Sequence, residues 1–224
     1  MSNQSSFLEQ ELKAEIDERK DLMLRIKLLL KRTKLAQDKH LFLAYSIPIV
    51  YSIWEGFVKE AFQIYVRELN KLNLSIDEIC DQIFIYHMES RFSQLKNNYP
   101  QDFKKKARLF SKLQIFYTAG RFDIHPEINT ESNIDFKVMN RILEEFNLNT
   151  IPEHINSGDG YSFKDNLNNF LLKNRNAAAH GDRSMPVQEE DLMKAIALVE
   201  KLMDLVFERI LDGFINERYR KTRI

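Results

Sequence analysis

Apolar side chains recur every three or four residues along most of this chain, and this spacing constrains its fold more than any other feature. Because an α-helix has about 3.6 residues per turn, side chains spaced in this way share one face of a helix. Only 6 glycines and 5 prolines occur in 224 residues, so the chain has few of the turns that a β-protein needs. The pattern predicts an all-α protein. Near the N-terminus the repeating positions are Leu8, Leu12, Ile16, Met23, Ile26 and Leu30.

Two long helices are expected at the N-terminus. The first should begin with a capping box at Ser6, where Glu9 follows three residues later, and should reach about residue 35. The second should run from near Asp38 to about Leu72, with a kink at Pro48, which has no backbone N–H to donate. We expect the pair to form an antiparallel hairpin over residues 1–72.

Shorter helices and loops are expected over residues 75–160. A second capping box at Ser75 should open a helix that reaches about Lys96, and Asp102 should open another that ends near Gly120. A short amphipathic helix should follow at 136–146, with loops at 122–133 and 152–160. We interpret this region as a helical insertion between the long helices.

Two further helices are expected over residues 161–219. One should start at Phe163 and stop at Gly181, because glycine readily takes the left-handed conformation that ends helices, and a long one should run from Val187 to about Tyr219. The basic tail 220–224 could be either a solvated end or a contact to nucleic acid. We expect residues 1–224 to form a single helical bundle with long antiparallel helices.

The charge balance limits the partners that the whole molecule can attract. Its 33 basic and 33 acidic residues cancel, so a nucleic acid or an anionic membrane would have to be bound by a local patch. The run Phe103-Lys104-Lys105-Lys106-Ala107-Arg108 is one candidate for touching RNA backbone. A solvated helix face is the alternative interpretation of the same residues.

A soluble, cytoplasmic protein is expected. The single cysteine, Cys80, excludes an internal disulfide and a zinc site built from several cysteines. The N-terminus lacks a secretory signal, and the most apolar segment, 41–54, is shorter than the roughly 18 residues of a membrane span, so we interpret it as a buried core helix. The other histidines, apart from His180, lack helical ligand spacing, so no metal and no other cofactor is expected. They are His40, His87, His125 and His154.

The stretch RNAAAHG, residues 175–181, contains the side chains best suited to chemistry. On a helical wheel, Asn176 and His180 lie together, four residues apart, roughly opposite the apolar face, and Arg175 lies at its flank. Asn176 could therefore reach His180 across one turn and orient its imidazole. The three alanines between them are small enough for a second copy of the chain to dock closely. The apolar face consists of Phe163, Leu167, Phe170, Leu171 and Ala178.

These three side chains suit phosphodiester cleavage without a metal. A histidine can transfer protons, an arginine can hold a phosphate with two hydrogen bonds, and an amide can orient either of them. In RNA the ribose 2′-hydroxyl is an internal nucleophile, so the protein needs only a base and a cation at the phosphorus. This chemistry predicts an RNA substrate and a 2′,3′-cyclic phosphate product. Judged by spacing alone, Arg175 could instead pair with a carboxylate and His180 could cap the helix.

The stretch at 175–181 resembles the Arg-Asn-x-x-x-His signature of the HEPN superfamily. The segment AYSIPIVYSIWEGFVKEAFQIYV, residues 44–66, is similar to the aromatic-Trp-Glu-Gly-Phe-x-Lys helix of the MAE-type HEPN branch, and residues 132–148 resemble its following short helix. The three matches occur in family order.

The resemblance implies an all-helical fold that dimerises so that two Arg-His motifs line one cleft. It also implies a metal-independent endoribonuclease of a toxin–antitoxin or antiviral defence system. Arg175, Asn176 and His180 match the family motif directly. Glu55 lies where this branch has an acidic residue and could orient Arg175 or His180; an exposed helix carboxylate is the alternative.

One position departs from the family pattern. HEPN toxins that pair with a nucleotidyltransferase antitoxin usually have a tyrosine two residues after the histidine, and this chain has Asp182 there. Control by adenylylation is therefore not expected. An antitoxin that covers the cleft, or a larger defence complex, stays open as a partner. A HEPN domain that binds RNA or nucleotide without cleavage, and a helical adaptor subunit, are the alternative functions.

Overall fold

The computed structural model describes residues 3–118, 122–131, 133–182 and 186–222. Over these residues the chain forms helices joined by loops, with no β-strand, which confirms the all-α prediction. The helices are α1 (Asn3–Arg32), α2 (Ala36–Lys71), α3 (Asp81–Arg91), α4 (Ser93–Lys96), α5 (Phe103–Thr118), α6 (Phe136–Glu145), α7 (Phe163–Asp165), the π-helix η1 (Asn166–Leu172), α8 (Lys173–Ala179) and α9 (Glu189–Ile215).

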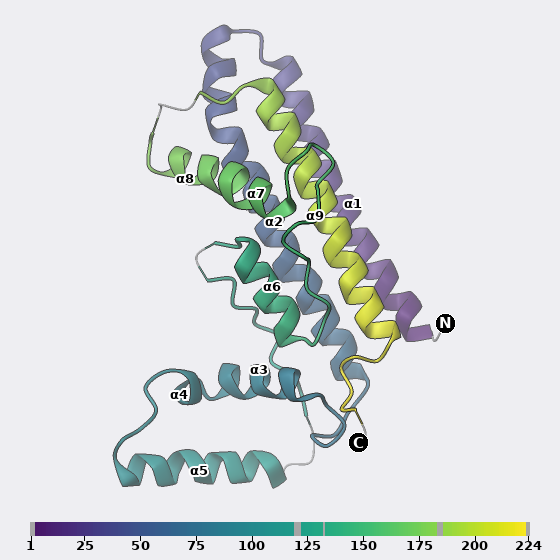
Figure 1. Ribbon diagram of the computed structural model, residues 1–224, viewed down its shortest axis with the longest axis vertical. Helices are drawn as coiled ribbons and strands as arrows, with labels where there is room; N and C mark the ends of the chain where they lie inside the picture. Colours follow the sequence, from purple (N-terminus) through teal and green to yellow (C-terminus); the bar gives the residue numbers. More distant parts are fainter. Residues whose placement is uncertain (1–2, 119–121, 132, 183–185, 223–224) are drawn as a thin grey trace.

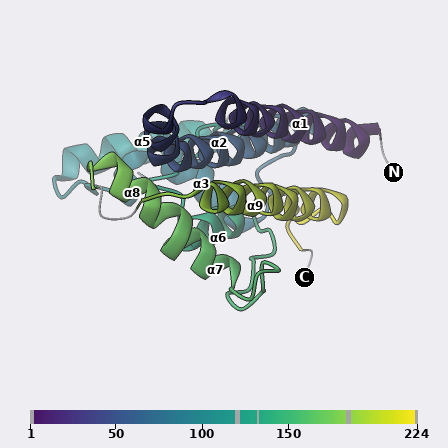
Figure 2. The ribbon, with the colours of Figure 1, turned by 90° about the horizontal axis from the view of Figure 1, so that it is seen from above.

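Three long helices, α1, α2 and α9, pack against one another and contribute most of the core. α1 and α2 run antiparallel, and α9 lies beside both (Figure 1). Seen from above, α9 lies between α1 and the shorter helices α6 and α7 (Figure 2). The largest buried side chains come mostly from α2, and burying them removes extensive apolar surface from water. They include Trp54, Tyr51, Tyr65, Phe57 and Phe62.

The segment 41–54 lies in α2, where Ile47, Val50 and Trp54 are buried in the core. By length and composition α2 is also long and apolar enough to cross a membrane, but half of its apolar window is buried inside the protein. The core helix of a soluble protein has these same properties. Pro48 lies inside α2 without ending it, although it removes one backbone donor from the helix.

Two expected helix starts are wrong. α1 begins at Asn3, so Ser6 lies within the helix and does not cap it. Ser75 and Glu78 do bond, because the Glu78 carboxylate accepts from the Ser75 backbone and hydroxyl at 3.0 Å. That bond closes a turn, and α3 begins only at Asp81. A capping box is a local motif, which can stabilise an isolated turn as well as a helix end.

The helix before the motif is not a regular α-helix. α7, η1 and α8 are continuous, but residues 166–172 have the wider turns of a π-helix. A helical wheel uses one fixed angle per residue, so it does not correctly relate side chains before this segment to side chains after it. The buried face still includes Phe163, Leu167 and Leu171, whereas Ala178 is half-buried at the edge of a pocket.

Part of the basic tail is held against the body. Lys221 donates its backbone N–H to the Glu78 carbonyl at 2.8 Å, and Cys80 donates to the Tyr219 carbonyl at 2.9 Å. The Arg220 guanidinium lies 3.2 Å from the Glu78 carboxylate. These contacts attach residues 220–221 to the body, and the Lys221 side chain remains exposed. Residues 223–224 lie outside the described residues, as does Gly120, the expected end of α5.

Candidate active site

Helix α8 ends at His180 in a Schellman motif. The Gly181 backbone N–H donates to the Ala178 carbonyl at 3.1 Å, and the Asp182 N–H donates to the Ala177 carbonyl at 2.9 Å. Gly181 has a φ of 71°, a left-handed conformation that glycine adopts without a Cβ clash. The helix therefore stops at the glycine, as the sequence predicts. His180 is the last residue before the reversal, and its side chain is exposed.

Arg175 lies five residues before His180 and bridges α8 to α2. Its guanidinium carbon lies 5.2 Å from the centre of the Tyr51 ring, within cation–π range. One guanidinium nitrogen donates to the Asn176 side-chain oxygen at 2.9 Å. Arginine has five N–H donors, so this single bond leaves donors for an anion. Among the described residues, no hydrogen bond joins the Asn176 side chain to His180.

Tyr51 is a site residue that the sequence analysis missed. Its ring is buried in the core, and its hydroxyl accepts the Ile134 backbone N–H at 2.6 Å. Burial raises the pKa of Tyr51 to about 12, so the phenol stays neutral beneath the arginine. The sequence feature that could have indicated Tyr51 is its position one turn before Glu55 on α2. Tyr51 connects the motif helix, α2 and the segment that leads into α6.

Glu55 has partners other than the motif residues. Its carboxylate accepts from the Lys59 ammonium at 2.7 Å and from the Thr130 hydroxyl at 3.4 Å. Over the described part of the chain, no ion pair joins it to Arg175. Its negative charge acts on Tyr51, where it contributes to the raised pKa. Glu55 therefore lies near Tyr51, whose ring packs under Arg175, and among the described residues it pairs with neither Arg175 nor His180.

Two asparagines of the π-helix η1 form hydrogen bonds to neighbouring segments. Asn168 accepts the Phe136 backbone N–H at 2.9 Å, which attaches η1 to the start of α6. Asn166 is buried and donates to the Ser157 hydroxyl at 2.6 Å and to the Asp159 carboxylate at 2.9 and 3.0 Å. The Ser157 hydroxyl bond is the main cause of the lowered pKa of Asp159. These bonds fix the helix that carries the motif.

A family model described as "HEPN_MAE_28990-like HEPN" matches residues 8–219 of the chain. The chain belongs to the HEPN superfamily. The matched range runs from the first turns of α1 to the end of the C-terminal region, so it includes α8 and the helices that pack against it. No curated protein and no solved structure matches the chain significantly.

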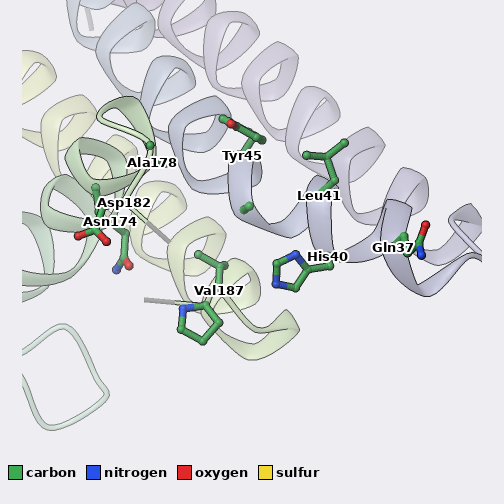
Figure 3. A pocket seen from close by; sticks show the side chains of 12 residues that line it. Gln37, His40, Leu41, Tyr45, Asn174, Ala178, Asp182 and Val187 are labelled. Atoms are coloured by element: carbon green, nitrogen blue, oxygen red, sulfur yellow. The ribbon is translucent and has the colours of Figure 1, made fainter. Parts of the chain in front are cut away.

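A pocket of about 320 Å³ lies next to the HEPN motif, between α2 and α8. His40, Leu41 and Tyr45 face it from α2, and Asn174 and Ala178 line it from α8 (Figure 3). Arg175, Asn176 and His180 are not among its lining residues. The pocket and these three side chains therefore occupy neighbouring faces of α8, and Ala177 and Ala178 lie toward the pocket.

The chemical groups of the site are an arginine, an amide and a histidine, all at the accessible end of one helix. Among the described residues, no group of three or more His, Cys, Asp or Glu side chains is arranged to hold a metal ion. The site can bind an anion through Arg175 and move a proton through His180.

Proposed function

We propose that this HEPN protein is an endoribonuclease that cleaves RNA without a metal. The observation that carries the proposal is the position of Arg175 and His180, five residues apart at the exposed end of α8. Arg175 is held by Tyr51 and Asn176 and still has free N–H donors. An arginine fixed in this way can bind a phosphate, while the neighbouring imidazole faces solvent and an incoming ribose.

In the proposed reaction, His180 accepts the proton of a ribose 2′-hydroxyl. The 2′-oxygen then attacks the adjacent phosphorus, and the bond from phosphorus to the 5′-oxygen breaks. The leaving 5′-oxygen takes a proton from water or from a second histidine of a dimer, so the products are a 2′,3′-cyclic phosphate and a 5′-hydroxyl. Arg175 stabilises the negative charge on the phosphate oxygens as they become crowded.

The proposal includes a homodimer with a composite site. Leu41, Tyr45 and Ile49 point outward from α2 at one-turn intervals, and all three are exposed. They adjoin the pocket beside α8. A row of exposed apolar side chains at this spacing is a surface that a second helix can cover. A two-fold contact here would bring two motif helices close together.

Cleavage of a mixed-sequence RNA in the presence of a chelator tests the nuclease proposal. Substituting His180→Ala should lower the rate about 10²- to 10⁴-fold, the usual contribution of a general acid or base. Arg175→Ala should lower it by a similar factor, because it removes the charge on the phosphate. His154→Ala, in an exposed loop away from the motif, is the matched control. Undiminished cleavage by His180→Ala would exclude the assigned role.

One observation favours a second function, binding of RNA or nucleotide without cleavage. The Asn176 side-chain oxygen is occupied by Arg175, and no described residue forms a hydrogen bond with the His180 ring. A histidine that is not oriented is a poor base. Tight binding of RNA or nucleotide with no turnover at any RNA concentration would establish this function. A helical adaptor would instead keep its partner after both Arg175 and His180 are substituted.

We also propose that the cellular role is that of a toxin or an antiviral defence effector in the cytoplasm, restrained by an antitoxin or by other subunits of a complex. Expression of the wild-type chain should then arrest growth, and His180→Ala should abolish the arrest. Equal growth of cells that express either chain would contradict this role.

A further inference from the structure

Helix α5 differs in charge from the rest of the protein. Its sixteen residues include five cations and no acidic residue, within a chain whose total charges cancel. A helix of this composition concentrates positive electrostatic potential on one short element. Figure 1 shows α5 at one end of the molecule, on the same side of the three long helices as α8. The cations are Lys104, Lys105, Lys106, Arg108 and Lys112.

The cations of α5 lack the acidic partners that cations have elsewhere. On α1, Lys13, Arg19 and Arg25 each pair with a carboxylate four residues earlier at 2.6 to 2.7 Å. None of the α5 cations lies in an ion pair with a described residue, and Lys106 instead lies 5.6 Å from the centre of the Tyr99 ring. Unpaired cations that keep their counterions can release them on binding a polyanion.

Aromatic side chains line one edge of the same helix. Phe103, Phe110 and Tyr117 follow at intervals of seven residues, which is close to two helical turns. Phe103 is 80% exposed and Phe110 is 56% exposed. At about 100° per residue, Lys106 lies on the same side of α5 as Phe103 and Phe110, and the other four cations lie about 110° to 170° farther around the helix. A single strand that crosses this exposed surface can place its phosphates on the cations and stack its bases on the rings.

Another side of α5, about 120° around the helix from these rings, is buried and attaches the helix to the protein. Leu109 and Phe116 are buried, and the Phe116 ring stacks on His87 with centres 5.3 Å apart. An amphipathic helix binds a membrane by inserting a broad apolar face among the lipids. In α5 Leu109 and Phe116 are covered by the protein, and the exposed Ile115 lies on the side of the cations, away from Phe103 and Phe110. The helix therefore presents no single broad apolar face, so a membrane fits it less well than a single-stranded nucleic acid does.

We infer that α5 is an anchor for single-stranded RNA, in which the five cations bind phosphates and Phe103 and Phe110 stack on unpaired bases. The inference rests on the proposed function, since it supplies the bound strand that the motif of α8 would cut. It requires no catalysis of its own, so binding and cleavage can be tested separately.

The experiment measures binding of a mixed-sequence 2′-O-methyl oligonucleotide, which has no free 2′-hydroxyl and cannot be cut by the proposed reaction. Substituting Lys104, Lys105, Arg108 and Lys112 together by Gln should weaken binding at least tenfold. The slope of log affinity against log salt should become less negative by about 3, because each phosphate that the cations no longer neutralise accounts for about 0.7 of it. Phe103→Ala and Phe110→Ala should each weaken binding about fivefold or more.

Matched controls separate this role from general charge. Substituting Lys13, Lys20, Arg25 and Lys31 of α1 by Gln removes the same charge and should change affinity less than threefold. His154→Ala, in an exposed loop, should bind the oligonucleotide like the wild type. Equal losses of affinity in the α5 and α1 variants would overturn the inference, as would binding of the wild type to phosphatidylserine vesicles and not to the oligonucleotide. If the wild type and the α5 variant cut RNA equally well, the nuclease proposal stands and the anchor proposal fails. If binding depends on α5 but no RNA is cut, the anchor proposal stands and the nuclease proposal fails.

Discussion

Arg175 depends on a residue from another helix for its position. A guanidinium on an exposed helix end samples many rotamers, and fixing it costs conformational entropy. Here the Tyr51 ring lies beneath it, and Tyr51 is itself held by burial and by the Ile134 N–H. The arginine is therefore positioned before any anion arrives, which is what charge stabilisation in a reaction requires.

Removing the Tyr51 hydroxyl should weaken the fold more than the chemistry. Tyr51→Phe keeps the ring under Arg175 and leaves the Ile134 N–H without its acceptor. We expect a loss of about 1 to 3 kcal/mol in the free energy of unfolding, measured by urea denaturation. Cleavage should be retained at temperatures where the variant is folded. Tyr45→Phe, whose side chain is exposed, is the control and should be neutral. Equal stabilities of the two variants would contradict the expectation.

His87 should make the protein less stable in mild acid. Its ring is buried, and its Nδ1 accepts the His125 backbone N–H at 3.0 Å. Burial, together with the nearby Arg91 and His125, lowers the pKa of His87 to about 4. The unfolded chain binds a proton near pH 6.5 and the folded chain does not, so the unfolding free energy falls as the pH drops from about 6.5 toward 4.

The size of this effect is about 2 kcal/mol between pH 7 and pH 5. Urea denaturation at the two values measures it. His87→Gln cannot titrate in this range, and its unfolding free energy should change less between the same two pH values. A variant with the full wild-type pH dependence would show that His87 is not the group responsible.

At the scale of elements, the end of α8 depends on one backbone conformation. The Schellman motif reverses the chain directly after His180 and directs residues 181–182 away from the helix axis. Glycine allows this reversal, whereas a side chain at the same φ meets a steric penalty. The position of the His180 ring relative to Arg175 thus depends on Gly181, which itself takes no part in the chemistry.

Substitutions at Gly181 should therefore be ranked by their tolerance of the left-handed region. Gly181→Ala should lower the unfolding free energy by about 1 to 2 kcal/mol, and the RNA cleavage rate should fall with it. Gly181→Asn should cost less on both measures, because asparagine visits this region more readily. Thermal denaturation and the cleavage assay can be run on the same samples. If alanine proved as good as asparagine, the reversal would not be what limits this position.

At the scale of the whole molecule, the exposed apolar row on α2 should decide the oligomeric state. Ile49 is 43% exposed, so Ile49→Glu should leave the fold intact and place a charge in the proposed dimer surface. We expect a monomer by light scattering and loss of RNA cleavage. Ile85→Glu on α3, where the side chain is 54% exposed, is the matched control and should stay dimeric. A wild-type chain that is monomeric at all concentrations would contradict the composite site.

Helix type and motif position were predictable from the sequence, because both depend on short-range spacing. The 3.6-residue period marked α2 and α9, and Gly181 marked the end of α8. Arg175, Asn176 and His180 are close in sequence, so a single helix end places all three within two turns of one another. The fold class followed from the same periodicity and from the scarcity of glycine and proline.

Only the tertiary structure decided which long-range partners these residues have. Asn166 and Asn168 of the π-helix bond to segments that precede it in the sequence. The π-helix itself changes the angle between successive side chains from the value in a regular α-helix. Glu55 pairs with Lys59 and contacts Thr130, although its sequence position suggested a partner in the motif. A hydrogen bond or a ring contact between distant segments depends on the packing of whole helices, and local periodicity contains no information about it.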